Sequence, residues 1–150
     1  MYKVCAFSGH RNLNAYPLDY SLLDRVTENL IKSGTEKFLC GMALGFDFAA
    51  AECVINLKKM YKINLTACIP CADQSAVYSR AGRLRYENIL DCCDEVITLS
   101  ESYTSGCMHG RNRFMVDNSD VLICFLRKKS GGTFYTFNYA KKSGKTVIEL

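Results

Sequence analysis

The stretch that decides the fold is Lys37-Phe38-Leu39-Cys40-Gly41-Met42-Ala43-Leu44-Gly45-Phe46-Asp47. It begins with a short apolar run that ends at Gly41, as a buried strand does. From Phe46 to Tyr61 apolar side chains recur at helical spacing, and Asp47 brings a negative charge to the first turn, where the helix dipole favours it. The stretch therefore predicts a buried strand, a glycine-bearing turn and an amphipathic helix.

The same alternation of short apolar runs and helical patterns continues along the whole chain. Strands are predicted at residues 3–7, 37–40, 63–69, 95–99, 121–126 and 146–150. Helical patterns lie between them, at residues 18–30, 46–61, 84–90, 111–116 and 131–140. Such alternation is typical of a parallel sheet covered on both faces, and right-handed crossovers leave few topologies. We therefore expect an α/β fold with a doubly wound, mainly parallel, Rossmann-like sheet, in a single domain of residues 1–150.

Composition excludes several classes of protein. The chain has 150 residues, of which 49% are hydrophobic and 23% charged, so it is neither disordered nor of low complexity. Nineteen basic against 15 acidic residues give a net charge of +4, far below that of an arm that wraps nucleic acid. No apolar run approaches the roughly 18 residues of a membrane span, and no signal-peptide core is present. We expect no membrane association and a cytoplasmic location.

Nine cysteines are an unusually high and odd number. Most lie inside apolar runs, where a free cysteine behaves as a small hydrophobe, and we expect reduced core residues. Cys68-Ile69-Pro70-Cys71 has the spacing of a redox motif or of half a zinc site. Cys68 falls within a predicted strand rather than at a helix start, and no second ligand pair has standard zinc spacing. The sequence therefore predicts neither a metal site nor a bound cofactor.

Parallel sheets bind ligands at the carboxyl ends of their strands, which directs attention to the segments that follow them. Three of these segments are rich in glycine or basic residues: Ser8-Gly9-His10-Arg11, Gly41 to Asp47, and Arg127-Lys128-Lys129-Ser130-Gly131-Gly132-Thr133. Glycine lets backbone N–H groups approach a ligand, and the helix start behind it favours negative charge, so phosphate is the natural occupant. The alternative is that these glycines only permit tight turns, since neither glycine-rich turn matches a standard phosphate-binding fingerprint.

Four side chains near these segments could contribute to such a site. Arg11 and Arg111 suit a phosphate or carboxylate through paired hydrogen bonds. Asp47 could bond ribose hydroxyls or only cap its helix. Tyr103, in the loop after the fourth strand, could stack on a base.

Taken together, these motifs resemble the YpsA-type family, which is similar to the SLOG superfamily of Rossmann-like proteins. That superfamily includes the "lonely guy" phosphoribohydrolases and the DNA-processing protein DprA. The resemblance covers essentially the whole chain and rests on five segments: Phe7-Ser8-Gly9-His10-Arg11, Gly41 to Asp47 with Ala50-Ala51-Glu52, Ile69-Pro70 with Gln74, Arg111 to Asp117 with Ser119-Asp120, and Gly131-Gly132-Thr133 with Ala140. It implies a nucleotide or nucleotide-derived ligand in a bacterial or phage cytoplasm, and it is compatible with a homodimer and with a protein partner.

The enzyme branch of the superfamily offers a closer comparison. Its phosphoribohydrolases carry an Arg-Lys pair before a Met, and a GGxGTxxE loop whose glutamate serves in cleaving the bond between base and ribose. Here Arg111 matches the Arg, Asn112 replaces the Lys, and Thr136 stands where the glutamate would be. A threonine cannot take up a proton as a carboxylate does, so Asp47 or Glu52 would have to supply that group.

Three functions follow from this reading. We expect a binding or sensor module for a nucleotide-like small molecule, with a nucleotide N-glycosidase or phosphoribohydrolase-like hydrolase as the alternative. Single-strand DNA binding through Lys128, Lys129 and the arginines is disfavoured, because the chain lacks a dense strip of basic and aromatic residues. The predicted ligand site comprises Ser8, Gly9, His10, Arg11, Gly41, Gly45, Asp47, Tyr103, Arg111, Asn112, Gly131, Gly132 and Thr133.

Overall fold

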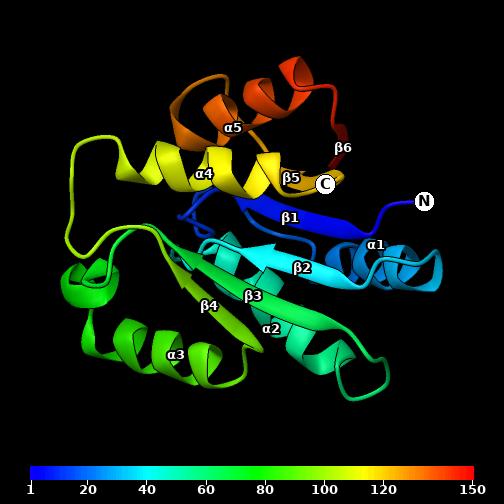
Figure 1. The fold of residues 1–150 in the computed structure, drawn as a ribbon, viewed down its shortest axis with the longest axis horizontal. Coiled ribbons are helices and arrows are strands. Elements are labelled where there is room, and N and C mark those ends of the chain that lie inside the picture. The colour runs from blue at the N-terminus through cyan, green and yellow to red at the C-terminus, as the bar shows by residue number, and fades with distance from the viewer.

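Six strands form one parallel sheet in the order β4-β3-β2-β1-β5-β6 (Figure 1). The computed structural model describes all residues 1–150. The strands are β1 (Val4–Gly9), β2 (Lys37–Cys40), β3 (Asn64–Ile69), β4 (Glu95–Thr98), β5 (Val121–Phe125) and β6 (Thr146–Glu149). Every neighbouring pair is parallel, so the predicted doubly wound, Rossmann-like α/β fold is confirmed.

Helices cover both faces of this sheet. They are α1 (Tyr20–Lys32), α2 (Phe46–Leu57), the 3-10 helix η1 (Gln74–Val77), α3 (Arg80–Asp91), α4 (Cys107–Asp117) and α5 (Gly131–Lys142). In Figure 1, α4 and α5 lie on one side of the sheet and the earlier helices on the other. The chain thus winds outward from β1 to β4, crosses to the opposite face, and continues from β5. The switch in direction falls between β1 and β5.

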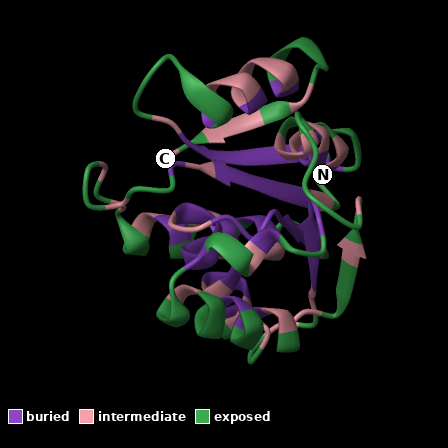
Figure 2. Cartoon of the chain, turned by 90° about the vertical axis from the view of Figure 1, so that its left-hand side faces the viewer, coloured by how far each residue is buried: buried purple, intermediate pink, exposed green.

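Alternate residues of the central strands enter two separate cores. The larger core, of 24 buried residues, lies under α1, α2 and α3 and contains Phe7, Phe38 and Phe125 from the sheet. The smaller core, of eight buried residues, lies under α4 and α5. It contains Ala6 of β1 and Leu39 of β2, which lie on the opposite face of the sheet from Phe7 and Phe38. Figure 2 shows the central strands buried between helices with exposed outer surfaces. The buried aromatic residues of the strands therefore all lie on the face covered by α1, α2 and α3.

The helix starts fall into two kinds. The side chain of Asp19 accepts a hydrogen bond from the N–H of Leu22 at 3.1 Å, and Ser79 accepts one from Gly82 at 3.1 Å, so α1 and α3 are capped. No side chain caps α2, α4 or α5. The first N–H groups of a helix have no partner within it. These three helices follow β2, β4 and β5, so their starts face the carboxyl edge of the sheet. The first N–H of α2 donates to the carbonyl of His10 and that of α4 to the carbonyl of Thr104, both at 3.1 Å.

Several boundaries differ from those expected. β1 runs on to Gly9, because Ser8 and Gly9 still pair with β5. The third helix begins at Arg80 rather than at residue 84 and the fourth at Cys107 rather than 111, because apolar periodicity marks only the buried turns. β4 and β6 are less buried than the four central strands, because each is a sheet edge with a neighbouring strand on one side only.

Gly45 occupies a backbone conformation that fixes its identity, with φ 78° and ψ −116°. A Cβ there would lie 2.2 Å from the carbonyl oxygen of Arg11. We predict that Gly45→Ala lowers the free energy of unfolding by roughly 2–5 kcal/mol, from backbone strain and overpacking together. Gly144→Ala is the matched control, since Gly144 has φ 72° but no atom near a Cβ, and it should cost only about 1–2 kcal/mol. Urea unfolding measures both, and equal losses would contradict the close approach of Arg11.

Candidate functional site

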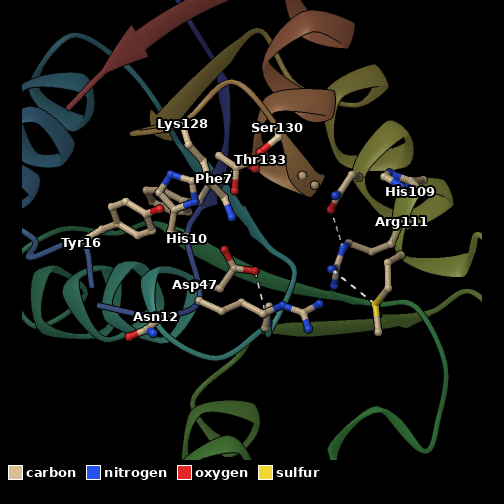
Figure 3. A pocket seen from close by; sticks show the side chains of 18 residues that line it. Phe7, His10, Asn12, Tyr16, Asp47, His109, Arg111, Lys128, Ser130 and Thr133 are labelled. Atoms are coloured by element: carbon tan, nitrogen blue, oxygen red, sulfur yellow. Dashed lines mark hydrogen bonds between the residues drawn. The ribbon is translucent and has the colours of Figure 1, made fainter. Parts of the chain in front are cut away.

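A cleft of about 380 Å³ opens at the carboxyl ends of β1 and β5, where the winding direction switches (Figure 3). Four segments surround it: the end of β1 with the loop after it, the turn between β2 and α2, the first turns of α4, and the turn from β5 into α5. Its walls are formed by Phe7, Ser8, Gly9, His10, Arg11, Asn12, Tyr16, Ala43, Asp47, Met108, His109, Arg111, Asn112, Lys128, Ser130, Gly131, Gly132 and Thr133.

Most of the residues predicted to bind a ligand line this one cleft. They are Ser8, Gly9, His10, Arg11, Asp47, Arg111, Asn112, Gly131, Gly132 and Thr133. Gly41, Gly45 and Tyr103 are not part of its wall. Tyr103 is 64% exposed in the loop after β4. This loop lies away from the cleft, because β4 is an edge strand separated from β1 by β3 and β2.

Three of the predicted glycines serve the protein's own packing. A Cβ on Gly9 would lie 2.3 Å from the ring of Phe46, and one on Gly41 would lie 2.8 Å from the guanidinium of Arg111. Gly45 faces the backbone of Arg11 in the same way. The protein's own packing is therefore sufficient to require glycine at these three positions, and a contact of their backbone with a ligand stays a prediction. Gly132 is different, because nothing lies within 4 Å of a Cβ built there.

The start of α5 is open toward the cleft. Ser130 makes no capping bond, Gly131 has φ 86°, and Gly132 follows at the exposed surface. The Thr133 side chain points into the cleft below Lys128 in Figure 3. Free N–H groups, a hydroxyl and an ammonium group converge here, which is the arrangement that binds phosphate at a helix N-terminus.

Arg111 is held in place by the protein. It is 3% exposed, its Nη1 donates to the carbonyl of Gly41, and its Nε donates to Oδ1 of Asn112 at 2.8 Å. The Sδ of Met108 lies 3.8 Å from its Nη2. The guanidinium thus links α4 to the end of β2 and presents a fixed positive charge to the cleft.

Asp47 is the one carboxyl group in the wall of the cleft. It is 6% exposed, and its Oδ2 accepts a hydrogen bond from the N–H of Ala43 at 3.2 Å. Burial raises the pKa of Asp47 to about 6, against the opposing effects of Arg111, of the Ala43 N–H and of Arg11. A carboxyl group with a pKa of about 6 can give or take a proton near neutral pH.

His10 joins the two sides of the switch point. Its Nε2 accepts a hydrogen bond from the N–H of Arg127 at 2.7 Å, which requires that nitrogen to be unprotonated. Burial lowers the pKa of His10, with further lowering by Lys128 and Arg127. Its ring packs 4.6 Å from that of Tyr16, centroid to centroid. His10 is therefore a neutral contact between the loop after β1 and the turn after β5.

The sequence interpretation missed several wall residues, among them Asn12, Tyr16, Met108 and Ser130. Asn12 directly follows one predicted segment and Ser130 lies inside another, so their position was a usable signal. No sequence signal indicated Tyr16 or Met108. Tyr16 reaches the cleft through the path of the loop after β1, and Met108 through the orientation of α4.

Two alternatives raised by the sequence lie outside the cleft. Glu52 pairs with Arg85, whose Nε donates to its Oε2 at 2.9 Å, on the far side of α2 from Asp47.

Cys68 is buried in β3, and all nine cysteines are free in the structure. No group of three or more His, Cys, Asp or Glu side chains is placed to hold a metal ion.

The YpsA family model, described as the YspA SLOG family, matches residues 5–147. The chain belongs to this family. A Bacillus subtilis relative of this YpsA-family chain, the uncharacterized SPbeta prophage-derived protein YoqJ, is 30% identical over 89% of the chain and 85% of its own length. A UPF0398 protein of Halalkalibacterium halodurans is 33% identical over 75% of the chain and 62% of its own length.

Solved structures share the fold of this YpsA-family chain. DNA processing protein A from Helicobacter pylori, a protein with a unique single-stranded DNA binding mode, superposes with a TM-score of 0.70 at 21% identity. The Streptococcus pneumoniae protein DprA superposes equally well, with a TM-score of 0.70 at 19% identity. The chain spans 64% and 50% of these two proteins. None of its helices is long and apolar enough to cross a membrane.

Because the pKa of Asp47 is raised, the stability of this YpsA-family chain depends on pH. Its pKa is about 6 in the folded protein against 3.8 normally, so folding favours the protonated form. This contribution is full below pH 3.8 and is lost as the pH rises through about 6. We predict that the stability of Asp47→Asn relative to wild type rises by up to about 3 kcal/mol between pH 4 and 7.5. Urea unfolding at the two pH values measures this, and a constant difference would contradict it.

Proposed function

We propose that this protein binds a phosphate-bearing, nucleotide-like small molecule in the cleft and acts as a binding or sensor module. The observation that carries the proposal is the open start of α5, where Gly132 and Thr133 border the cleft without a capping side chain. A phosphate placed there would receive backbone N–H bonds, the Thr133 hydroxyl bond and the helix dipole together.

The charges around the cleft support an anionic ligand. Arg11, Arg111 and Lys128 contribute three cations to the wall, while Asp47 contributes the one carboxyl group. In a concave site such an excess raises the local concentration of anions. Asp47 lies on the β2 side of the cleft and suits the ribose hydroxyls, which would donate to its carboxylate oxygens.

The proposal includes a cytoplasmic location and an output through a protein partner or a second copy of the chain. A protein that binds a ligand without reacting with it needs such a partner. Ligand binding only stabilises one conformation of the protein over another, and a partner must recognise that conformation.

Hydrolysis of the bond between base and ribose is the second candidate. It is favoured by Asp47, whose pKa of about 6 suits a group that activates water or protonates a leaving base. Thr136 cannot take this role, since it is 2% exposed and its hydroxyl donates to the carbonyl of Gly132 at 2.9 Å. In the balanced reaction, water adds to the ribose carbon as the glycosidic bond breaks, and the base leaves with a proton.

Single-stranded DNA is a competing ligand, because the Helicobacter pylori protein with this fold has a single-stranded DNA binding mode. The same open helix start could accept one phosphate of a strand. A longer strand would need further cations along its path, and binding would then weaken steeply with salt. A mononucleotide held in a cleft would show a much smaller salt effect.

We predict that Gly132→Val abolishes binding of nucleoside phosphates while the protein stays folded, because only open space surrounds a Cβ at this position. Thr133→Ala should weaken binding by roughly 10- to 150-fold, which corresponds to one hydrogen bond to a charged group. Calorimetry with AMP, ADP-ribose and NAD against adenosine measures both effects.

Gly144→Ala is the control for that experiment, since Gly144 lies beyond the far end of α5 and should bind as wild type does. An oligo(dT) arm at two salt concentrations tests the DNA reading. Equal affinity for AMP and adenosine, or indifference to Gly132→Val, would show that the Gly131–Thr133 turn holds no phosphate.

The hydrolase reading makes a separate prediction. Asp47→Asn should abolish release of free base from nucleoside 5′-monophosphates, while binding of the same compounds falls by less than about 10-fold, because the amide keeps its acceptor but cannot carry the proton. Chromatography of reaction mixtures detects the base. Absence of base release from the wild-type protein would leave the binding function and exclude this candidate.

A further inference from the structure

A second hollow, of about 450 Å³, lies beside the cleft. It sits between the carboxyl ends of β3 and β4 and the first turns of α4, inside the long loop that joins β4 to α4 (left side of Figure 1). Its walls are Pro70, Leu99, Ser100, Thr104, Cys107, Gly110, Arg111 and Phe114. Arg111 is the one residue that belongs to the walls of both the cleft and this hollow.

Arg111 separates the two spaces as a fixed side chain. Its bonds to the carbonyl of Gly41 and to Asn112 hold the guanidinium plane in position. Met108, which lines the cleft, contacts the same guanidinium at 3.8 Å. Arg111 and Met108 thus form part of the boundary, and a ligand that filled both spaces would lie across Arg111.

The chemistry of the hollow differs from that of the cleft. Pro70, Leu99 and Phe114 give it apolar walls, and Ser100 and Thr104 add hydroxyl-bearing residues, of which Ser100 donates to the carbonyl of Ser102. Apart from the already bonded Arg111, no charged side chain lines it. Such a space disfavours phosphate and suits a flat, uncharged group that can stack on a guanidinium plane or an aromatic ring and bond hydroxyls at its edge.

The ring of His10 in the cleft offers no equivalent platform. The ring of His10 packs against Tyr16 at 4.6 Å and against Phe125 at 5.8 Å, and its Nε2 is already bonded to Arg127. His10 is only 6% exposed, so its ring presents little surface to a ligand.

We propose that the hollow is the nucleobase subsite of a nucleoside 5′-phosphate whose phosphate lies at the start of α5. This inference rests on the proposed function and extends it, because it requires the ligand to carry an intact base and to lie across Arg111. The base occupies the space between Phe114 and Arg111, and the ribose lies over the cleft near Asp47.

Gly110 provides a direct test, because it lines the hollow and not the cleft. A Cβ there would meet only the Nη2 of Arg113, at 3.7 Å, so the helix accepts a larger residue and Gly110→Leu fills the hollow. The probes are ribose 5-phosphate and the four nucleoside 5′-monophosphates, measured by calorimetry. At least one monophosphate should bind wild type roughly 5- to 150-fold tighter than ribose 5-phosphate, the range for stacking one base.

Gly110→Leu should remove that advantage and leave the affinity for ribose 5-phosphate unchanged. Gly132→Val should lose both kinds of ligand. If Gly110→Leu keeps the wild-type preference for monophosphates, or if wild type shows no preference, the base subsite is overturned while the phosphate site stands. If wild type binds neither ribose 5-phosphate nor any monophosphate, the proposed function fails, and this inference with it.

Cys107 gives a second readout that does not depend on affinity. It is a half-buried free thiol in the wall of the hollow, and Cys92 is an exposed thiol at the end of α3. With iodoacetamide and peptide mass spectrometry, saturating monophosphate should slow alkylation of Cys107 at least about 5-fold and leave Cys92 unchanged, whereas ribose 5-phosphate should slow neither. Alkylation of Cys107 at the same rate with and without bound monophosphate would overturn the assignment.

Discussion

The hydrogen bond from Arg111 to the carbonyl of Gly41 is the contact on which the cleft depends. It joins α4, on one face of the sheet, to the carboxyl end of β2 across 70 positions of sequence. A buried guanidinium is stable only where its nitrogens find acceptors, and those of Arg111 donate to the carbonyl of Gly41, to Oδ1 of Asn112 and to Sδ of Met108. Gly41 must lack a side chain for this approach, since a Cβ would lie 2.8 Å from the guanidinium. One interaction therefore sets the position of α4, fixes a positive charge and divides the two hollows.

The same contact makes the carboxyl group of Asp47 tolerable. Burial of an ionised carboxylate is costly, and the pKa of about 6 records that cost. Arg111, the N–H of Ala43 and Arg11 all lower this pKa, so the group stays able to ionise near neutral pH. A buried acid that the protein partly stabilises is more typical of a functional site than of a core. The side chain of Asp47 accepts a hydrogen bond from a turn N–H and does not cap its own helix, while its bonding to ribose hydroxyls stays a proposal.

The distribution of helix caps explains why the site forms on this edge. α1 and α3 receive side-chain caps from Asp19 and Ser79, whereas α2, α4 and α5 start without one. At α2, the carbonyl of His10 occupies the position of a ligand, because the N–H of Phe46 donates to that carbonyl at 3.1 Å. At α5, no protein group does so. An open helix start beside fixed cations is a place where an anion completes the hydrogen bonding of the protein.

The sequence by itself determined the fold, because short apolar runs and helical spacing are local properties that each strand and helix carries independently. It also indicated the edge of the sheet that matters, since residues such as Ser8, Gly131 and Thr133 directly follow strands. Only the tertiary structure decided which of these residues meet. Gly9 and Gly45 are committed to packing against Phe46 and Arg11, and Tyr103 lies away from the cleft because β4 is an edge strand. The reason is that long-range contacts such as that of Arg111 with Gly41 depend on the strand order and on the orientation of α4. Neither of these is encoded in any one segment.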